Sequence, residues 1–244
     1  GGEAMSNGPS GRAAQWQPAA GADARQVLRV PSMYPTIMDA IRRAGMDDTV
    51  LVSSGHYRET LDVRDKVLEI TGEGKMQELL VEGPAGAPAM VQEGGFVRIS
   101  NLLIKSSGAT GVEVNRGRVV IEDCNVSGAG VGLALYGASE ATLRRSVVCR
   151  CRQCGIVVSG GSRAMVEFCS VFENGDKGMA VTDAGSHLHL TRSMLSYNHG
   201  VGVAIDEGGE GSIEDNDLRH NGQGPLHVGT SSAAKVVVGS NLVS

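Results

Sequence analysis

The stretch that decides the fold is residues 155–181, which read GIVVSGGSRAMVEFCSVFENGDKGMAV. It opens on a Gly followed by an apolar-x-apolar triplet, and the same pattern returns at its end as Gly178-Met179-Ala180-Val181. Between the two lie short runs of alternating apolar and polar residues, separated by Gly, Ser, Asn or Asp. These runs are too short for helices, so the unit predicts three short strands joined by tight turns.

This unit recurs at intervals of 22 to 25 residues, and its apolar positions form columns. The first column contains Ile99, Ile121, Leu143, Val166, Leu190, Ile213 and Val238. The second contains Ile104, Val126, Val148, Val171, Leu195, Leu218 and Val243. One repeat cannot bury its apolar side chains alone, but coils stacked about 4.8 Å apart place both columns inside a tube. We therefore predict an all-β parallel β-helix, a solenoid.

The residues before the repeats predict a cap for this tube. Residues 34–44 place apolar side chains at helical spacing behind Pro35 and ahead of Gly45. A helix there would shield backbone groups that an open β-helix end leaves unpaired. Coils are expected from about residue 49, and the first two look longer and less regular. Residues 1–25, rich in Gly, Ala, Pro and Gln, predict a flexible linker or tail ahead of a β-helix domain over 26–244.

Composition narrows the function. The net charge is −5 and aromatic residues make up only 3%, so we expect no nucleic-acid binding. The sequence contains no stretch of 18 apolar residues, so it predicts no membrane-spanning helix. The five cysteines are odd in number and confined to neighbouring coils. This pattern favours a reducing, cytoplasmic location over a disulfide framework.

Several segments resemble a known family. Residues 34–41, YPTIMDAI, and 55–59, GHYRE, are similar to the first segment of the pectin-lyase-like right-handed β-helices. Residues 172–179, FENGDKGM, resemble the carbohydrate-binding and sugar-hydrolase-type repeats of β-helix F-box receptors, SHC-binding spindle proteins and NosD-type accessory proteins. The resemblance covers about residues 30–244 and implies a right-handed parallel β-helix. It implies no single activity, because this scaffold serves lyases, esterases, hydrolases and binding proteins alike.

The catalytic motifs of these enzymes do not accompany the resemblance. Pectin methylesterases use a Gln-Asp pair, whereas Gln92, Gln153 and Gln223 are each followed by another residue. The Asn-Thr-Asp, Asp-Asp and Gly-His-Gly motifs of polygalacturonase-like enzymes are also absent. A calcium-dependent lyase site has the candidates Asp176, Asp183 and Asp206, with Lys177 and Arg192 as bases. Because Asp beside Gly or Asn is ordinary turn chemistry, we assign no catalytic residue.

Two clusters have a structural interpretation. Asn174, Asn198 and Asn221 share one repeat position, where stacked Asn side chains bond to one another and tolerate left-handed backbone. The cysteine-dense run 149–154 lacks the second matched pair that zinc requires. We interpret its thiols as small buried side chains, with a metal or redox site as the alternative. We expect no metal and no cofactor.

A group of arginines on successive coils is the main candidate for ligand binding. The predicted binding residues are Arg144, Arg145, Arg150 and Arg152, with Tyr197 and His220 forming a small amphipathic spot. Such a stripe attracts an acidic peptide, a phosphate or a sugar acid. However, Glu122, Arg144 and Glu167 share one column, which predicts local ion pairs.

These observations predict a non-catalytic binding or scaffold module. Its long rigid face would recognise a protein partner, with a glycan or another acidic ligand as a further possibility. The alternative is a polysaccharide-active enzyme, a lyase, esterase or hydrolase. The clustering of charged side chains distinguishes the enzyme from the scaffold. An enzyme brings at least two carboxylates and an Arg or Lys together in one groove, whereas a scaffold disperses its charges.

Overall fold

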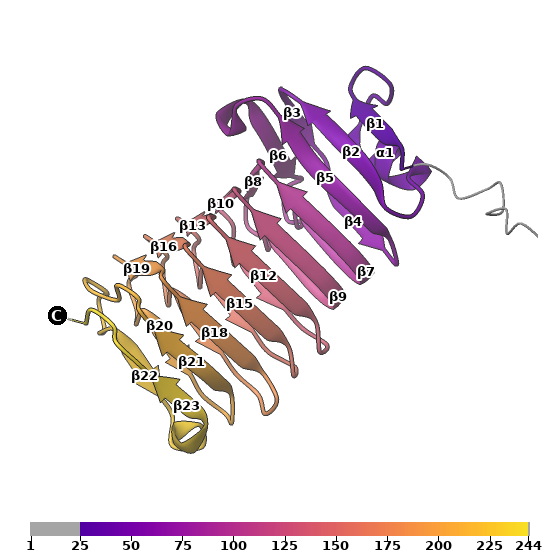
Figure 1. Cartoon of the computed structure of the whole chain (residues 1–244). Helices are drawn as coiled ribbons and strands as arrows, with labels where there is room; N and C mark the ends of the chain where they lie inside the picture. Colours follow the sequence, from indigo (N-terminus) through magenta and orange to yellow (C-terminus); the bar gives the residue numbers. More distant parts are fainter. Residues whose placement is uncertain (1–24, 244) are drawn as a thin grey trace, which may run out of the picture.

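The computed structural model describes residues 25–243, which form an elongated parallel β-helix (Figure 1). Successive coils place their short strands side by side, and every strand pair is parallel, as in β13 with β16 and β14 with β17. The predicted linker, residues 1–25, lies outside the described residues except for Arg25. Within the described part, no helix combines the length and apolar character needed to cross a bilayer.

The strands form three faces along the tube. The first face contains β1 (Val27–Val30), β2 (Asp48–Ser53), β5 (Val67–Glu73), the second halves of β7 (Met90–Ser100) and β9 (Val112–Glu122), β12 (Glu140–Arg144), β15 (Arg163–Glu167), β18 (His187–Thr191), β21 (Glu210–Glu214) and β23 (Val236–Val238). The second face contains β3 (Gly55–Arg58), β6 (Leu79–Gly83), β8 (Leu103–Ser106), β10 (Asn125–Ser127), β13 (Val147–Cys149), β16 (Ser170–Phe172) and β19 (Met194–Ser196). The third face contains β4 (Leu61–Arg64), the first halves of β7 and β9, β11 (Leu133–Leu135), β14 (Ile156–Val158), β17 (Met179–Val181), β20 (Val203–Ile205) and β22 (Leu226–Val228).

The strand register confirms both apolar columns. On the first face, Leu143 pairs with Ile121 on one side and Val166 on the other. On the second face, Val171 pairs with Val148 and Leu195. All of these side chains are fully buried. These members of the columns therefore form the interior of the tube, and the residues that alternate with them point outward. The prediction is wrong for the last member of each column, because Val238 and Val243 are 50% and 51% exposed.

The first coils are irregular in length, since Val50 pairs with Ile70 and Ile70 pairs with Ile99, and β7 and β9 each turn a corner without a break. Gly94, Gly95 and Gly117 have positive φ at these corners, and the pairing of β7 with β9 shifts register there. A Cβ on Gly95 would lie 2.1 Å from the carbonyl oxygen of Lys66, so only glycine fits this bend. Each of these two strands thus contributes to both the first and the third face.

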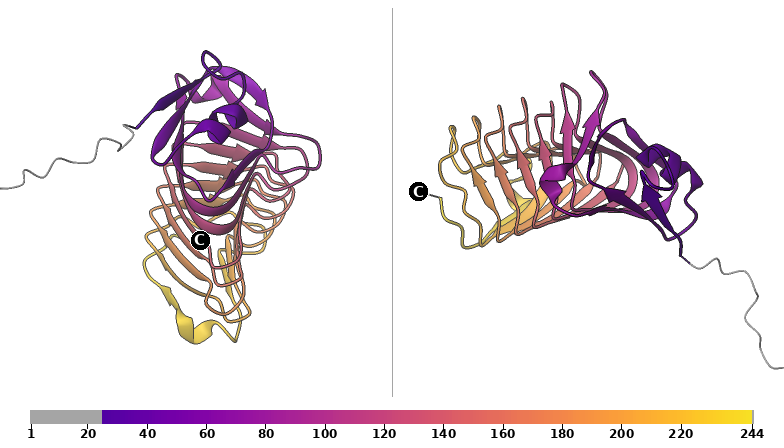
Figure 2. Two further views of the ribbon diagram at one scale, coloured as in Figure 1. Left: turned by 90° about the vertical axis from the view of Figure 1, so that its right-hand side faces the viewer. Right: turned by 90° about the horizontal axis from the view of Figure 1, so that it is seen from above.

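The predicted cap is α1 (Ile37–Arg43), which lies across the N-terminal end of the tube (Figure 2). It is shorter than the expected 34–44, because Thr36 takes the N-cap position and its side chain accepts a hydrogen bond from the Asp39 N–H. The Glu59 carboxylate also accepts from the N–H groups of Ile37 and Met38, at 3.0 and 2.9 Å. The helix ends where Ala44 takes extended backbone.

We predict that Val171→Asp unfolds the β-helix, because it buries an unpaired carboxylate in the apolar column. The cost is on the order of several kcal/mol, comparable with the whole stability of a domain. The measurement is thermal and urea denaturation followed by circular dichroism. The matched control is Ser170→Asp, whose half-buried side chain points outward from the same strand and should melt close to wild type. Equal melting of both variants would show that the column is assigned wrongly.

Candidate functional site

The predicted Asn ladder is confirmed in the turns between the second and third faces. Asn174 Nδ2 donates to Asn198 Oδ1 at 2.8 Å, and Asn198 Nδ2 donates to Asn221 Oδ1 at 2.9 Å. Asn174 Oδ1 accepts from the backbone N–H of Cys151 one coil earlier. Their hydrogen-bonding groups are thus engaged by the neighbouring coils, which makes these residues structural.

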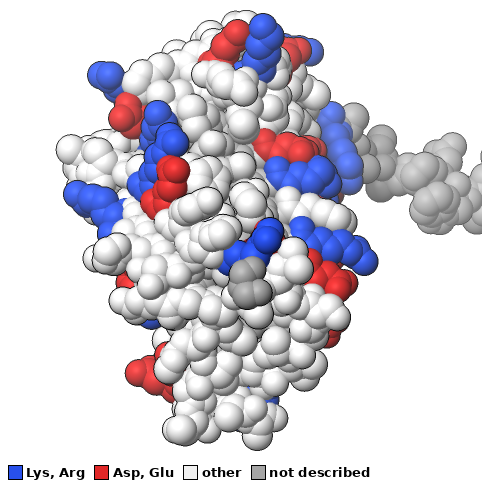
Figure 3. All heavy atoms as spheres, turned by 90° about the vertical axis from the view of Figure 1, so that its left-hand side faces the viewer, with Lys and Arg blue, Asp and Glu red and all other residues white. Residues whose placement is uncertain are grey.

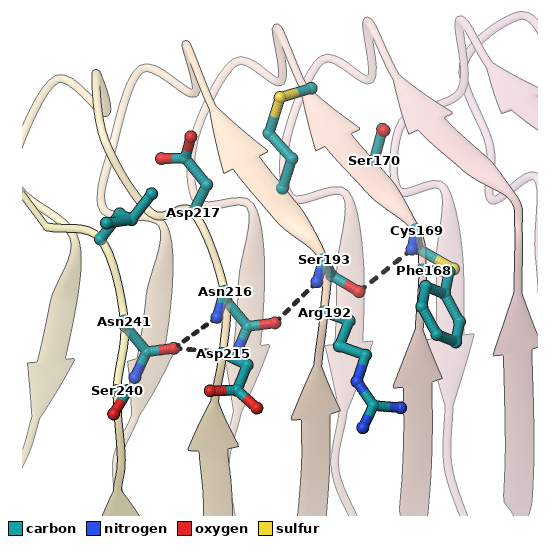
Figure 4. Close-up of a pocket in the computed structure, with 12 residues that line it drawn as sticks. Phe168, Cys169, Ser170, Arg192, Ser193, Asp215, Asn216, Asp217, Ser240 and Asn241 are labelled. Carbon is teal, nitrogen blue, oxygen red and sulfur yellow. Dashed lines mark hydrogen bonds between the residues drawn. The ribbon is translucent and has the colours of Figure 1, made fainter.

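A second ladder runs through the turns between the first and second faces. The N–H of Cys169 donates to Ser193 Oγ at 3.1 Å, and the N–H of Ser193 donates to Asn216 Oδ1 at 2.9 Å (Figure 4). The N–H of Asn216 donates in turn to Asn241 Oδ1 at 2.9 Å. The sequence reasoning missed this ladder because its inward positions mix Cys, Ser and Asn rather than repeating one residue type.

The cysteines are buried thiols within these coils. All five lack a disulfide partner and are buried. Burial raises the pKa of Cys124 and Cys151 to about 12 and that of Cys169 to about 11. At neutral pH these groups are therefore protonated and poorly nucleophilic.

The predicted binding arginines divide between two sides of the second face. Arg144 lies on β12 and pairs with Glu167 at 3.0 Å, and Arg145 follows in the next turn and pairs with Asp123 at 2.9 Å. The Arg145 hydrogen bond lowers the pKa of the Asp123 carboxyl. Basic and acidic side chains also lie beside one another at several places on the surface shown in Figure 3. The local pairing that the charge column predicted is present.

The other two arginines lie beyond β13, in the loop toward the third face. Arg150 pairs with Glu173 at 2.8 Å. The Arg152 guanidinium packs against Gly108, where an added Cβ would lie 2.8 Å from Nη2. The structure therefore spreads the four arginines over both edges of the second face, and three of them have intramolecular partners.

Tyr197 and His220 do come together. Both occupy left-handed turn positions on adjacent coils, and their rings stack with centroids 5.4 Å apart and planes 15° from parallel. Tyr197 is 65% exposed. The pair is held firmly, because the next residue in each turn belongs to the Asn ladder.

The candidate carboxylates and bases of a lyase site do not all come together. Asp183 accepts from the N–H of Gly160 in a turn, and Arg192 lies over the ring of Phe168. In contrast, Lys177 and Asp206 lie together on the outer surface of the third face, and Asp176 pairs with Lys177. Lys177 and Asp206 line one hollow of about 410 Å³, and Lys177 Nζ lies 3.1 Å from Asp176 Oδ2.

Small side chains form the floor of this hollow, which we call the Lys177 groove. Its lining residues are Lys177, Ala180, Thr182, Ala204, Asp206, Glu207, Gly229, Thr230 and Ser231. Ala180 on β17 pairs with Ala204 on β20, and Ala204 pairs with His227 on β22. These residues alternate with the buried column of β17 and β20, so they face outward. The charged side chains rise beside a floor of methyl groups.

His227 completes the cluster. Its Nε2 lies 3.2 Å from Asp206 Oδ1. The sequence reasoning missed it because Pro225 replaces the Gly that opens the other repeats' triplets. Extending the Gly-apolar-x-apolar pattern to Pro225-Leu226-His227-Val228 would have placed His227 in the outward column of Ala180 and Ala204.

The charges define what the groove can do. The hydrogen bond with Asp176 raises the pKa of Lys177, so this ammonium stays protonated at neutral pH and serves as a cation rather than a base. Asp206 Oδ1 lies 3.2 Å from Nε2 of His227, so the carboxylate orients the imidazole from that side and Nδ1 lies on the opposite edge of the ring. Among the described residues, no group of three or more His, Cys, Asp or Glu side chains has metal-binding geometry.

A family model described as "Right handed beta helix region" matches residues 89–242. The chain belongs to this family. Among solved structures, this β-helix resembles the rice weevil pectin methyl esterase, with a TM-score of 0.57 and 13% identity over 88% of this chain and 83% of that one. It also resembles a mutant pectin methylesterase in complex with a hexasaccharide, with a TM-score of 0.55 and 12% identity over 84% and 80% of the two chains. At these identities the likeness shows the fold. A search of curated proteins gives no match.

The buried thiols predict alkaline sensitivity of this β-helix. Their pKa values are raised by folding, so their stabilising contribution is complete below about pH 8.5, the pKa of an unfolded thiol. It is lost as pH rises toward 12, the pKa of folded Cys124. We expect the urea midpoint to fall between pH 8 and pH 10.5. Cys124→Ser should lessen this fall, because Ser146 and Ser193 already hold the same ladder position. An identical pH dependence in the variant would contradict the assignment.

Proposed function

We propose that this β-helix binds an acidic polysaccharide in the Lys177 groove and cleaves it by β-elimination. The observation that carries the proposal is a groove lined by Lys177, Asp206 and Glu207, with Asp176 paired to Lys177 and His227 3.2 Å from Asp206. Two carboxylates and a lysine in one groove are the clustering expected of an enzyme and not of a dispersed scaffold surface.

Lys177 supplies the charge that an acidic sugar needs. Its ammonium is protonated and about one-third exposed, so it can bind a uronate carboxylate at the groove surface. Neutralising that carboxylate also makes the neighbouring C–H more acidic, because the enolate that forms on proton loss places its charge on the same oxygens. Asp176 holds the ammonium in position from the side.

The Asp206–His227 pair supplies the base. The Asp206 carboxylate, 3.2 Å from Nε2, orients the imidazole of His227, and Nδ1 takes the proton from the carbon next to the uronate carboxylate. The electron pair of the broken C–H bond forms a double bond to the neighbouring ring carbon. The glycosidic C–O bond of this neighbouring carbon breaks at the same time. The leaving oxygen takes a proton from water. The products are a new hydroxyl end and an unsaturated sugar end.

The similar solved structures support a function in polysaccharide binding or cleavage, but they do not decide which reaction takes place. The two similar structures bear the name pectin methylesterase, and one of them holds a hexasaccharide. Their likeness to this chain rests on the fold, and the motifs of esterases and polygalacturonases are absent from its sequence. The chemistry of the Lys177 groove therefore carries the choice of elimination over ester hydrolysis.

Polygalacturonate and alginate should both bind the protein and release unsaturated, ultraviolet-absorbing ends. Lys177→Met should weaken binding in calorimetry by tenfold or more, because a charge-assisted hydrogen bond contributes about 1.5–3 kcal/mol. His227→Ala should leave binding intact and lower the cleavage rate at least a hundredfold, the usual contribution of a general base. The matched control is His220→Ala, because His220 stacks on Tyr197 and does not line the Lys177 groove, so the change should affect neither quantity.

Three outcomes would overturn the proposal. Methanol release from methylated pectin without unsaturated ends would make the reaction ester hydrolysis. Binding without any turnover would restore a non-catalytic module. No binding of either acidic polymer, or equal binding of a neutral galactan, would remove the Lys177 groove as the site.

Non-catalytic recognition of a protein partner is the second candidate function. A specific observation favours it, because the outer surface of the second face lacks charged side chains over three consecutive coils. This surface lies apart from the Lys177 groove on the third face, so the two functions do not compete for one site.

A further inference from the structure

The outer surface of β13, β16 and β19 has an uncharged centre. Its outward residues are Val147, Cys149, Ser170, Phe172, Met194 and Ser196, which adjoin in the strand register. On the first face, by contrast, the outward positions of the same coils include Glu140, Arg144, Arg163, Glu167 and His187. An exposed sheet without charge is unusual on a solvated surface and is typical of the centre of a protein interface.

Exposed apolar side chains extend this centre on both edges. Phe168 is 54% exposed in the turn before β16, Met194 is 39% exposed on β19, and Tyr197 is 65% exposed in the turn after β19. Phe168 and Tyr197 adopt left-handed backbone, which is costly for aromatic residues. The two ladders lock both turns, so these side chains are presented without a further ordering cost.

One buried polar atom on this surface has no partner among the described residues. Ser196 is 4% exposed and its hydroxyl makes no hydrogen bond. Ser196 pairs with Phe172 in the strand register and directly precedes Tyr197, whose ring stacks on His220. A polar group from an incoming chain would satisfy this hydroxyl, whereas an apolar contact alone would not.

Arginines surround the uncharged centre of the second face, and one of them, Arg192, differs from the others in its contacts. Arg145, Arg150 and Arg219 are each paired with a carboxylate, and the Arg219 hydrogen bond lowers the pKa of Asp217 to about 2. Arg192 differs. Its guanidinium lies over the Phe168 ring at 5.5 Å, and no carboxylate of the described chain lies within 4 Å of it. Figure 4 shows Phe168, Arg192 and Asp215 on one side of the turn ladder, bordering a hollow of about 630 Å³.

We propose that this surface, the Met194 face (Phe168, Phe172, Arg192, Met194 and Tyr197), docks a protein partner. The docking segment carries an apolar side chain that packs on Met194 and Phe172, flanked by a carboxylate that binds Arg192. The stacked guanidinium keeps its N–H donors in plane and free for a carboxylate. Charge complementarity thus selects an acidic-apolar segment, and Asp215 beside Arg192 accepts a basic group of the same partner.

A random dodecapeptide library displayed on phage tests the chemistry of the partner. Peptides selected on the wild-type protein should share an acidic residue next to apolar ones. Met194→Lys should weaken their binding tenfold or more, as expected for the centre of an interface. The matched control is Met165→Lys on the first face, because Met165 is 38% exposed on β15 and lies away from the Met194 face. Its affinity should equal that of wild type, and both variants should melt alike.

A charge exchange tests the role of Arg192. Arg192→Glu should weaken the selected peptides, more strongly at low salt, and a peptide with Lys in place of its acidic residue should recover binding to this variant. Peptides that lose no affinity in Met194→Lys, or no recovery in the exchange, would overturn the proposal. Dimerisation of the wild type that Met194→Lys abolishes would assign the face to a second copy instead. None of these readouts involves polysaccharide, so they are independent of the Lys177 groove.

Discussion

The structure depends on the parallel backbone hydrogen bonds that join each coil to the next. They fix the register, and the register decides which side chains stack into the interior and which stack on the surface. A slip by one residue would turn the column of Leu143, Val166 and Leu190 toward water, so burial and backbone pairing enforce the same alignment. Every surface column, functional or structural, follows from that constraint.

The two side-chain ladders strengthen this constraint at the turns, where the strands end. Turns leave backbone N–H groups without a strand partner, and an Asn or Ser side chain from the adjacent coil accepts hydrogen bonds from them. The same positions force the preceding residue into left-handed backbone with its side chain pointing out. Tyr197, His220, Phe168 and Arg192 all occupy such positions. The turns that hold the solenoid together therefore also display its most exposed rings.

The faces differ in chemistry although they share one architecture. The first face carries alternating charges that pair across coils, as in Arg98, Glu122, Arg144 and Glu167. The third face carries small side chains with Lys177, Asp206 and His227 around a shallow hollow. The second face carries neutral and apolar side chains. A rigid solenoid can maintain these surfaces independently, because each column depends on its neighbours above and below more than on the opposite side of the tube.

The sequence by itself determined the repeat, the inward columns, the Asn ladder and the cap helix. These features are local or strictly periodic, so alternation and spacing reveal them. Only the tertiary structure decided the grouping of the outward residues. Arg144 and Arg150 are six positions apart yet lie on different edges of the second face. In contrast, Lys177 and Asp206 come from two coils and line one groove, and His227 of a third coil contacts Asp206. Outward positions carry no burial pattern, so their neighbours become visible only once the coils are stacked in register.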